Sequence, residues 1–69
     1  MKKIKVTNEM LNRIEERMAN GESVEITFKS LSENAVRTER IKSVRWDGMI
    51  FTENSGYIDR MLDAVYEIK

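Results

Sequence analysis

Residues 35–52 read AVRTERIKSVRWDGMIFT, and this stretch decides the fold. Asp47-Gly48 is a strong signal for a hairpin turn of two residues, so the segments on either side are expected to form paired antiparallel strands. The first of these strands runs from about residue 35 to 46. A two-residue turn fixes the register. It predicts four core-facing side chains, with Val44 opposite Phe51 and Trp46 opposite Met49.

The first strand of this hairpin contains a conflict of register. Ile41 falls on the side of Arg45, opposite to Val44, so one straight strand cannot bury all of its apolar residues. A β-bulge near residues 40–43 resolves the conflict and bends the strand sharply, as small barrels require, and this is the favoured interpretation. The alternative leaves Ile41 and Ile50 as an exposed apolar pair on the outer face, available for binding.

Before the hairpin, the sequence predicts a short strand followed by a helix. Residues 2–6 are expected to form the short strand. Apolar residues recur at helical spacing from residue 9 to 20, which indicates an amphipathic helix with one apolar side. Thr7 or Asn8 can cap its first turn, and Gly21 supplies the left-handed residue that ends it.

Further strands are expected on both sides of the hairpin. Residues 23–30 alternate between apolar and polar side chains, which predicts a half-buried strand. After the hairpin, we expect a strand at residues 56–58, one helical turn over residues 60–64 and a closing strand at residues 65–68. A continuous C-terminal helix is the alternative, because the apolar residues of this tail also have helical spacing.

These elements predict a single α+β domain over residues 1–69, with a strongly bent antiparallel sheet and one N-terminal amphipathic helix. A chain of this length is near the lower limit for folding on its own core, and such chains commonly add disulfides, a metal or a partner subunit. Cys and His are both absent, so disulfides and the usual zinc ligand sets are excluded. We therefore expect self-association, as a homodimer rather than a monomer.

The residue types give little support for catalysis. Without His and Cys, the commonest general base and the best thiol nucleophile are missing. The glycines are isolated and serve turns or caps, so no phosphate-binding loop is present. We expect no enzyme activity, no cofactor and no metal site. The net charge is zero and no segment has membrane-spanning length, so we expect a cytoplasmic protein that acts by protein–protein contact and self-association.

One local excess of positive charge supports an alternative function. The long strand carries four basic residues: Arg37, Arg40, Lys42 and Arg45. Such a stripe beside aromatic side chains is typical of surfaces that bind nucleic acids or nucleotides. Exposed Arg and Lys also discourage edge-to-edge pairing of strands, so a solvated protective face explains the same residues. Trp46 is open to two interpretations as well, a core anchor or a binding hot spot.

From residue 24 onward the pattern resembles the small Sm-like barrels, including those of bacterial WYL-type regulatory domains. The resembling pieces are VEITF at residues 24–28 as an opening strand, the basic strand at residues 37–44, and IDRM at 58–61 followed by VYEI at 65–68. Such barrels bind nucleic acids, nucleotides or other proteins, so the resemblance implies a binding function without naming the ligand. The chain is also similar in style to small accessory proteins of bacteria and their phages.

Overall fold

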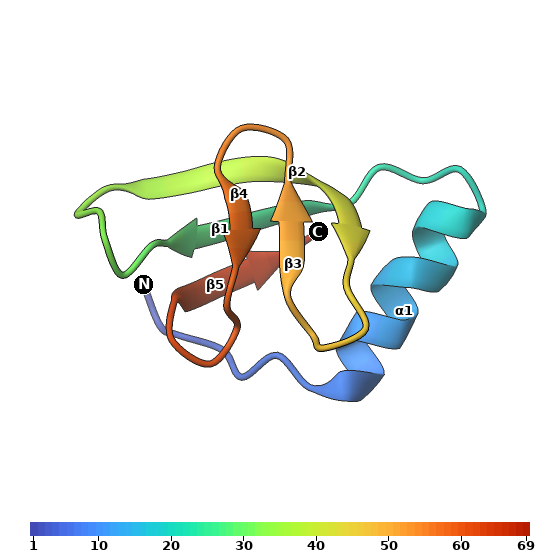
Figure 1. Cartoon of the computed structure of the whole chain (residues 1–69), viewed down its shortest axis with the longest axis horizontal. Coiled ribbons are helices and arrows are strands. Elements are labelled where there is room, and N and C mark those ends of the chain that lie inside the picture. Colours follow the sequence, from blue (N-terminus) through green and yellow to red (C-terminus); the bar gives the residue numbers. More distant parts are fainter.

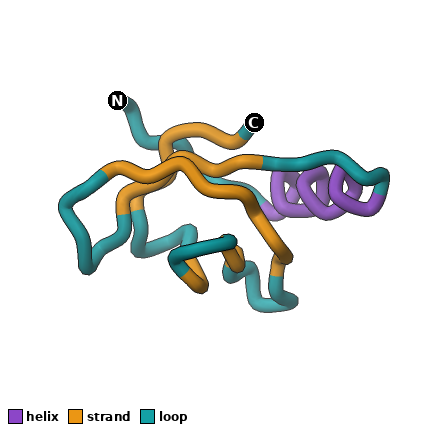
Figure 2. Tube along the Cα trace, turned by 90° about the horizontal axis from the view of Figure 1, so that it is seen from above, coloured by secondary structure: helices purple, strands orange, loops and turns teal.

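The computed structural model describes residues 1–69 as one helix followed by five strands (Figure 1). The elements are α1 at Asn8–Ala19, β1 at Glu25–Lys29, β2 at Val36–Val44, β3 at Ile50–Thr52, β4 at Gly56–Ile58 and β5 at Ala64–Ile68. One helix with a five-stranded antiparallel sheet makes this an α+β protein, as the sequence predicts. The helix lies at one end of the long axis and the β1–β2 loop at the other (Figure 2).

The predicted helix is confirmed together with both of its ends. The Thr7 hydroxyl accepts a hydrogen bond from the Met10 N–H at 3.2 Å, which satisfies one of the free amides of the first turn. After the last turn, Gly21 has a φ of 85°, a left-handed conformation that glycine adopts without steric cost. Leu11 and Ile14 are the buried residues of the apolar side.

The segment before α1 is not a strand, so the short strand predicted at residues 2–6 is wrong. Its one backbone hydrogen bond to the sheet runs from the Ile4 N–H to the Val65 carbonyl at 2.8 Å. A single bond is too few to form a ladder along the edge of β5. Val6 nevertheless packs into the core, so the segment is held by its side chain more than by its backbone.

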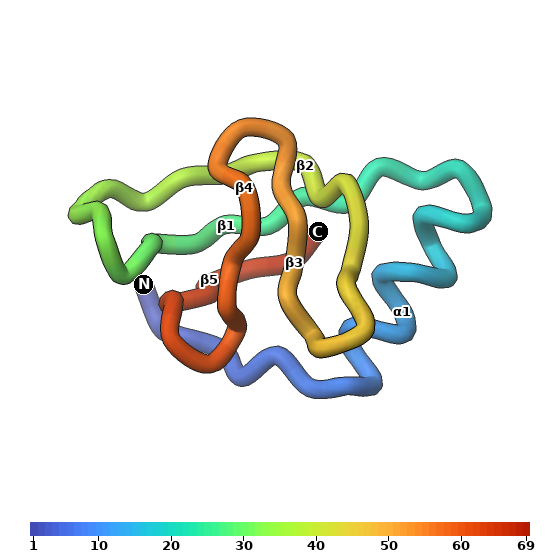
Figure 3. Tube along the Cα trace, viewed as in Figure 1, coloured from blue at the N-terminus to red at the C-terminus, as the bar shows by residue number.

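The sheet has the strand order β4-β3-β2-β1-β5, and β2 belongs to both halves of it. The first part of β2 pairs with β1, and its last part pairs with β3. The register shifts between Ile41 and Ser43, where β2 changes partner. Figure 3 shows the chain turning to a new direction at this place. The predicted bulge at residues 40–43 is therefore confirmed.

The bulge brings Ile41 of β2 and Ile50 of β3 into the core together. Ile41 is 3% exposed and Ile50 is 0% exposed. The extra residue of a bulge re-aims the side chains that follow it, which removes the conflict of register. The alternative in which Ile41 and Ile50 form an exposed pair is wrong, and neither residue is accessible to a binding partner.

The β2–β3 turn has three residues instead of the expected two. The Arg45 N–H donates to the Met49 carbonyl at 2.8 Å, and the Gly48 N–H donates to the Arg45 carbonyl at 2.9 Å. Trp46, Asp47 and Gly48 therefore form the loop. Gly48 has a φ of 89°, the left-handed position that a three-residue hairpin loop requires.

The longer turn changes which side chains face the core. Val44 pairs with Ile50 and not with Phe51, so the predicted register is wrong. Of the four residues predicted to face the core, only Val44 packs against it. A shift of one residue exchanges the two faces of a strand. Trp46 consequently lies at the tip of the turn with 93% of its surface exposed, and its interpretation as a core anchor is also wrong.

The C-terminal tail has the predicted order of strand, turn and strand. Between β4 and β5, the Asp59 carbonyl accepts hydrogen bonds from the N–H groups of Leu62 at 3.1 Å and Asp63 at 2.8 Å. This is one helical turn that does not continue. β5 then pairs with β1, so the alternative of a continuous C-terminal helix is wrong.

One cluster of ten buried apolar residues forms the core, drawn from the N-terminal segment, α1, the residue before β1 and all five strands. Its members are Val6, Leu11, Ile14, Val24, Ile26, Phe28, Ile41, Ile50, Ile58 and Val65. The bent sheet wraps around this cluster, but the edge strands β4 and β5 do not pair with each other. The sheet is therefore open and does not close into a barrel.

Candidate functional site

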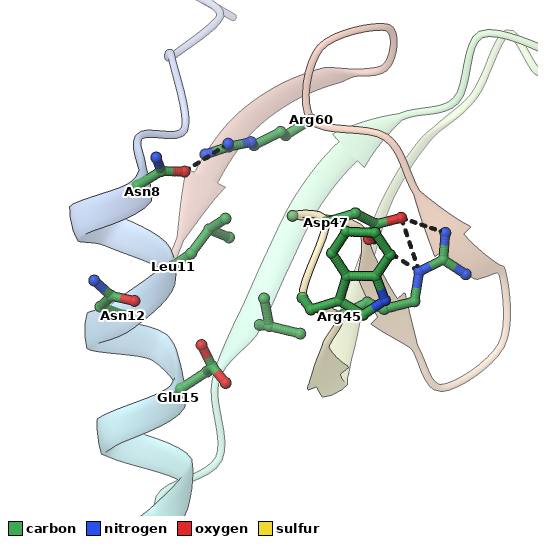
Figure 4. A pocket seen from close by; sticks show the side chains of 10 residues that line it. Asn8, Leu11, Asn12, Glu15, Arg45, Asp47 and Arg60 are labelled. Carbon is green, nitrogen blue, oxygen red and sulfur yellow. Dashed lines mark hydrogen bonds and ion pairs between the residues drawn. The ribbon is translucent and has the colours of Figure 1, made fainter.

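A cleft of about 630 Å³ lies between the first half of α1 and the β2–β3 turn. Its volume is within the range of ligand sites in proteins. The residues around it are Asn8, Leu11, Asn12, Glu15, Val44, Arg45, Trp46, Asp47, Gly48 and Arg60. Figure 4 shows Leu11 and Glu15 projecting from the helix toward the turn that carries Arg45 and Asp47. We call this site the Trp46 cleft.

Arg60 connects the parts of the chain that form the cleft. Its Nη1 donates to the Val6 carbonyl at 3.0 Å, and its Nη2 donates to Asn8 Oδ1 at 2.6 Å. Its Nε lies 3.2 Å from the position that a Cβ at Gly48 would occupy. One guanidinium thus contacts the N-terminal segment, α1 and the turn, which fixes the helix relative to the sheet.

The turn on the other side of the cleft is stabilised by Arg45 and Asp47. The Arg45 Nη2 lies 2.6 Å from Asp47 Oδ2, and the Arg45 Nε donates to both carboxylate oxygens at 2.9 and 3.0 Å. Asp47 Oδ1 also accepts from the Met49 N–H at 3.2 Å. The guanidinium lies over the Tyr57 ring, 4.6 Å from its centroid. These contacts link both ends of the turn to each other and to β4.

The ion pair favours the charged form of both partners. Hydrogen bonds from Arg45 outweigh desolvation and hold the pKa of Asp47 below its ordinary value, and the Met49 N–H adds to this effect. The hydrogen bond with Asp47 likewise raises the pKa of Arg45. Both side chains are therefore ionised at physiological pH, and the ion pair between Arg45 and Asp47 is present under these conditions.

Trp46 stands at the rim of the cleft on this fixed turn. Its backbone is constrained by the neighbouring contacts, while 93% of the residue surface is open to water. Tryptophan is enriched among the residues that dominate binding energies, because a large flat ring can be desolvated at a small cost in conformational entropy. The exposed indole is the main apolar group that the cleft presents.

The helix contributes polar groups that lie across from the turn. Glu15 lines the cleft and takes part in no ion pair. Asn12 adds an amide, which can both donate and accept. An indole face, a carboxylate and an amide in one cleft can bind a peptide segment, because the indole accepts an apolar or cationic side chain while the amide pairs with backbone groups.

The four basic residues of the predicted stripe do not form one surface. Because side chains alternate along a strand, Arg37 falls on the side of Glu39, whereas Arg40 and Lys42 fall on the opposite side. Arg45 lies beyond the bulge, where the turn begins. The stripe expected from the sequence is therefore divided between two faces and a turn.

Three of these four charges are also paired with carboxylates. Arg37 contacts Glu33 at 2.8 Å and Arg40 contacts Glu53 at 3.3 Å. Arg45 contacts Asp47, as described above. Lys42 alone forms no ion pair. Paired guanidinium groups attract phosphates less than free ones do, because binding must first displace the carboxylate or tolerate its repulsion.

The contact between Arg60 and Asn8 could not be predicted from the sequence. They are 52 positions apart, and neither the capping role considered for Asn8 nor the IDRM segment that contains Arg60 indicates that the two side chains meet. The exposed position of Trp46 did have a signal, since a hot spot was one of its two interpretations. Asp47-Gly48 is also compatible with a three-residue turn, and such a turn places Trp46 in the loop, where a binding residue would be exposed.

No group of three or more acidic side chains is arranged to hold a metal ion. No helix combines the length and the apolar character needed to cross a lipid bilayer.

No protein-family model, curated protein or solved structure matches this chain. Any function assigned to the Trp46 cleft therefore rests on the geometry of the cleft itself.

Proposed function

We propose that this chain is a non-enzymatic protein-binding domain that receives a segment of a partner protein at the Trp46 cleft. The observation that carries the proposal is the exposed indole of Trp46 on a turn held by the Arg45–Asp47 pair. Burial of a large apolar side chain contributes about 1.5–3 kcal/mol. Because the turn is already ordered, it loses little conformational entropy when the partner binds.

The composition of the cleft supports a protein segment more than a small apolar ligand. Pockets for small ligands are lined mainly by apolar side chains. In this cleft only Leu11, Val44 and Trp46 are apolar, and the remaining side chains are mostly amides and charged groups. Interfaces between proteins combine aromatic and Arg anchors with a polar rim, which is the combination found here.

The relation to Sm-like barrels belongs to the same proposal. An N-terminal helix and one bent, five-stranded antiparallel sheet support a relation to the Sm-like barrels. The open edge between β4 and β5 distinguishes this chain from a closed barrel. A small accessory protein of a bacterium or phage, active in the cytoplasm, would fit this description. The lack of cysteine agrees with a reducing compartment.

Nucleic-acid or nucleotide binding through Arg37, Arg40, Lys42 and Arg45 stays the alternative proposal. The division of these residues between faces and their pairing with carboxylates weigh against it. A titration with a single-stranded oligonucleotide separates the two functions. Binding through phosphates would appear at low salt and would weaken steeply as salt is added.

The protein-binding function can be tested by selection from a displayed library of random peptides against the full chain. We expect enriched peptides to shift the emission of Trp46, the only tryptophan, toward shorter wavelengths. In calorimetric titrations, Trp46→Ala should bind the same peptides about tenfold or more weakly. Val36→Ala changes an exposed residue outside the cleft and should bind them as the wild type does.

Two results would contradict the proposal. One is the recovery of no peptide above background. The other is a set of peptides that bind Trp46→Ala and the wild type with equal affinity, because their contacts would then lie outside the cleft.

A further inference from the structure

A second surface is formed where the β1–β2 loop meets the turn between β4 and β5. The first loop carries Leu31 and the second carries Leu62. The Leu31 N–H donates a hydrogen bond to Asp63 Oδ1 at 2.7 Å, which joins the two loops across 32 positions of sequence. Both leucines line the same two shallow hollows, so their side chains are neighbours.

The backbone under these leucines is fixed by acidic side chains. Asp63 Oδ2 accepts from the Asp59 N–H at 2.9 Å, and Asp59 Oδ1 accepts from the Met61 N–H at 2.8 Å. Even so, Leu31 is 74% exposed and Leu62 is 64% exposed. Two ordered loops therefore hold two large apolar side chains out in water.

Further apolar side chains enlarge this exposed area. Met49 and the half-exposed Tyr57 share one hollow with the two leucines. We call these four residues the Leu31–Leu62 surface. Scattered exposed apolar residues are normal, but a group gathered around one hollow is typical of a contact site. None of the four lines the Trp46 cleft, although Tyr57 and Met49 contact Arg45 and Asp47, which do line it. The two sites are therefore adjacent but have different apolar residues.

The charges around the surface favour a second copy of the same chain as its occupant. Lys3, Lys29 and Glu33 line the second hollow, while Asp59 and Asp63 line the first. A two-fold axis places such a mixed surface against itself, where opposite charges can face each other. A partner rich in one sign of charge would meet like charges here. The zero net charge also leaves no overall repulsion between copies.

The size of the molecule supports the same occupant. A core of ten residues is small, and association is one of the ways in which short chains add buried apolar surface. A standard interface buries roughly 800 Å² on each partner, about a sixth of the 4858 Å² that this chain exposes. The four apolar residues can form the centre of such an interface, with the polar residues of both hollows as its rim.

We propose that a second copy of this chain docks on the Leu31–Leu62 surface to form a two-fold symmetric homodimer with Leu31 and Leu62 at its centre. The dimer goes beyond the proposed partner binding and does not depend on it.

Sedimentation velocity over a dilution series tests the dimer. The wild type should pass from monomer to dimer as its concentration rises. The double variant Leu31→Ser with Leu62→Ser should dimerise roughly a hundredfold more weakly, because each change occurs twice in a symmetric interface. Trp46→Ser, which removes an even more exposed apolar residue from the other site, should dimerise as the wild type does.

Further measurements separate loss of the interface from loss of the fold. Because both leucines are exposed, the urea midpoint of the double variant should match that of the wild type at concentrations where both are monomeric. Leu62→Arg should block dimerisation as well, because the two-fold axis would bring two like charges together. The proposal would be overturned if the wild type stays monomeric at millimolar concentration, or if the leucine variants dimerise as tightly as the wild type. The occupant of the surface would then be a different protein.

Discussion

Ser55 donates two hydrogen bonds to Glu39, one from its hydroxyl to Oε2 and one from its backbone N–H to Oε1 at 3.0 Å. The Asn54 N–H donates a third at 2.9 Å. Glu39 is a buried residue of β2, whereas Asn54 and Ser55 form the turn between β3 and β4. The carboxylate therefore ties that turn to the strand on which the two halves of the sheet meet.

Glu39→Gln is expected to destabilise the fold near neutral pH by about 1–3 kcal/mol, because a charged acceptor of several hydrogen bonds is replaced by an amide. Burial by itself raises the pKa of Glu39, but the hydrogen bonds from Ser55 and Asn54 outweigh it and hold the pKa below its ordinary value of 4.5. A lowered folded-state pKa stabilises the fold fully above the unfolded-state pKa, and this contribution is lost as the pH falls through the folded-state pKa. Urea unfolding at neutral and acid pH measures the loss.

The matched control for this prediction is Glu25→Gln. Glu25 is an exposed residue of β1 and takes part in no ion pair. Its substitution should change the free energy of unfolding by less than about 0.5 kcal/mol at either pH. A penalty for Glu39→Gln that is the same at neutral and acid pH would show that the charge of Glu39 does not stabilise the turn.

Gly48→Ala is expected to destabilise the protein for two separate reasons. At a φ of 89°, an alanine costs about 1–2 kcal/mol in backbone strain. Its Cβ would also lie 3.2 Å from the Arg60 Nε, so the guanidinium would have to shift by a few tenths of an ångström, which disturbs its hydrogen bonds to Val6 and Asn8. Gly56→Ala serves as the control, since Gly56 has a φ of 73° but no atom within 4 Å of its added Cβ. Thermal unfolding should show the larger loss for Gly48→Ala, and equal losses would mean that Arg60 is not held against the turn.

The hairpin illustrates which parts of the fold could be predicted and which could not. Alternation and capping residues predicted the helix, the bulge and the main strands, because each depends on neighbours a few residues apart. Asp47-Gly48, however, occurs in two-residue turns and also ends three-residue turns. The choice is made by the Asp47 carboxylate, which binds Arg45 and the Met49 N–H on either side of the loop. That contact could not be predicted from periodicity.

The Trp46 cleft shows the same limit at longer range. Its rim depends on the length of one turn, and its shape depends on the contacts of Arg60 with Val6 and Asn8. Those contacts join residues more than fifty positions apart, and they form only after the sheet has folded against the helix. The basic strand does not form one continuous stripe for a related reason, because residues adjacent in sequence alternate between faces and meet different acidic neighbours.

Ile50→Val is expected to lower the free energy of unfolding by about 0.5–1.5 kcal/mol. Ile50 is fully buried in β3, so loss of one methylene leaves a small cavity beside the other core residues. Val36→Ala, at an exposed position of β2, should cost less than about 0.5 kcal/mol. If Ile50→Val and Val36→Ala both leave the free energy of unfolding unchanged in urea, Ile50 lies on the outer face of the sheet.

Trp46→Ala is expected to leave the free energy of unfolding within about 0.5 kcal/mol of the wild type, because 93% of the tryptophan is already in contact with water. The fluorescence of the wild type tests the same position directly, since Trp46 is the only tryptophan. At concentrations where the chain is monomeric, iodide should quench the emission of the folded protein nearly as well as that of the urea-unfolded protein. The emission maximum should also change little on unfolding. A folded protein that resists iodide, or a loss of several kcal/mol in Trp46→Ala, would place the indole in the core and remove the basis for a binding site at the turn.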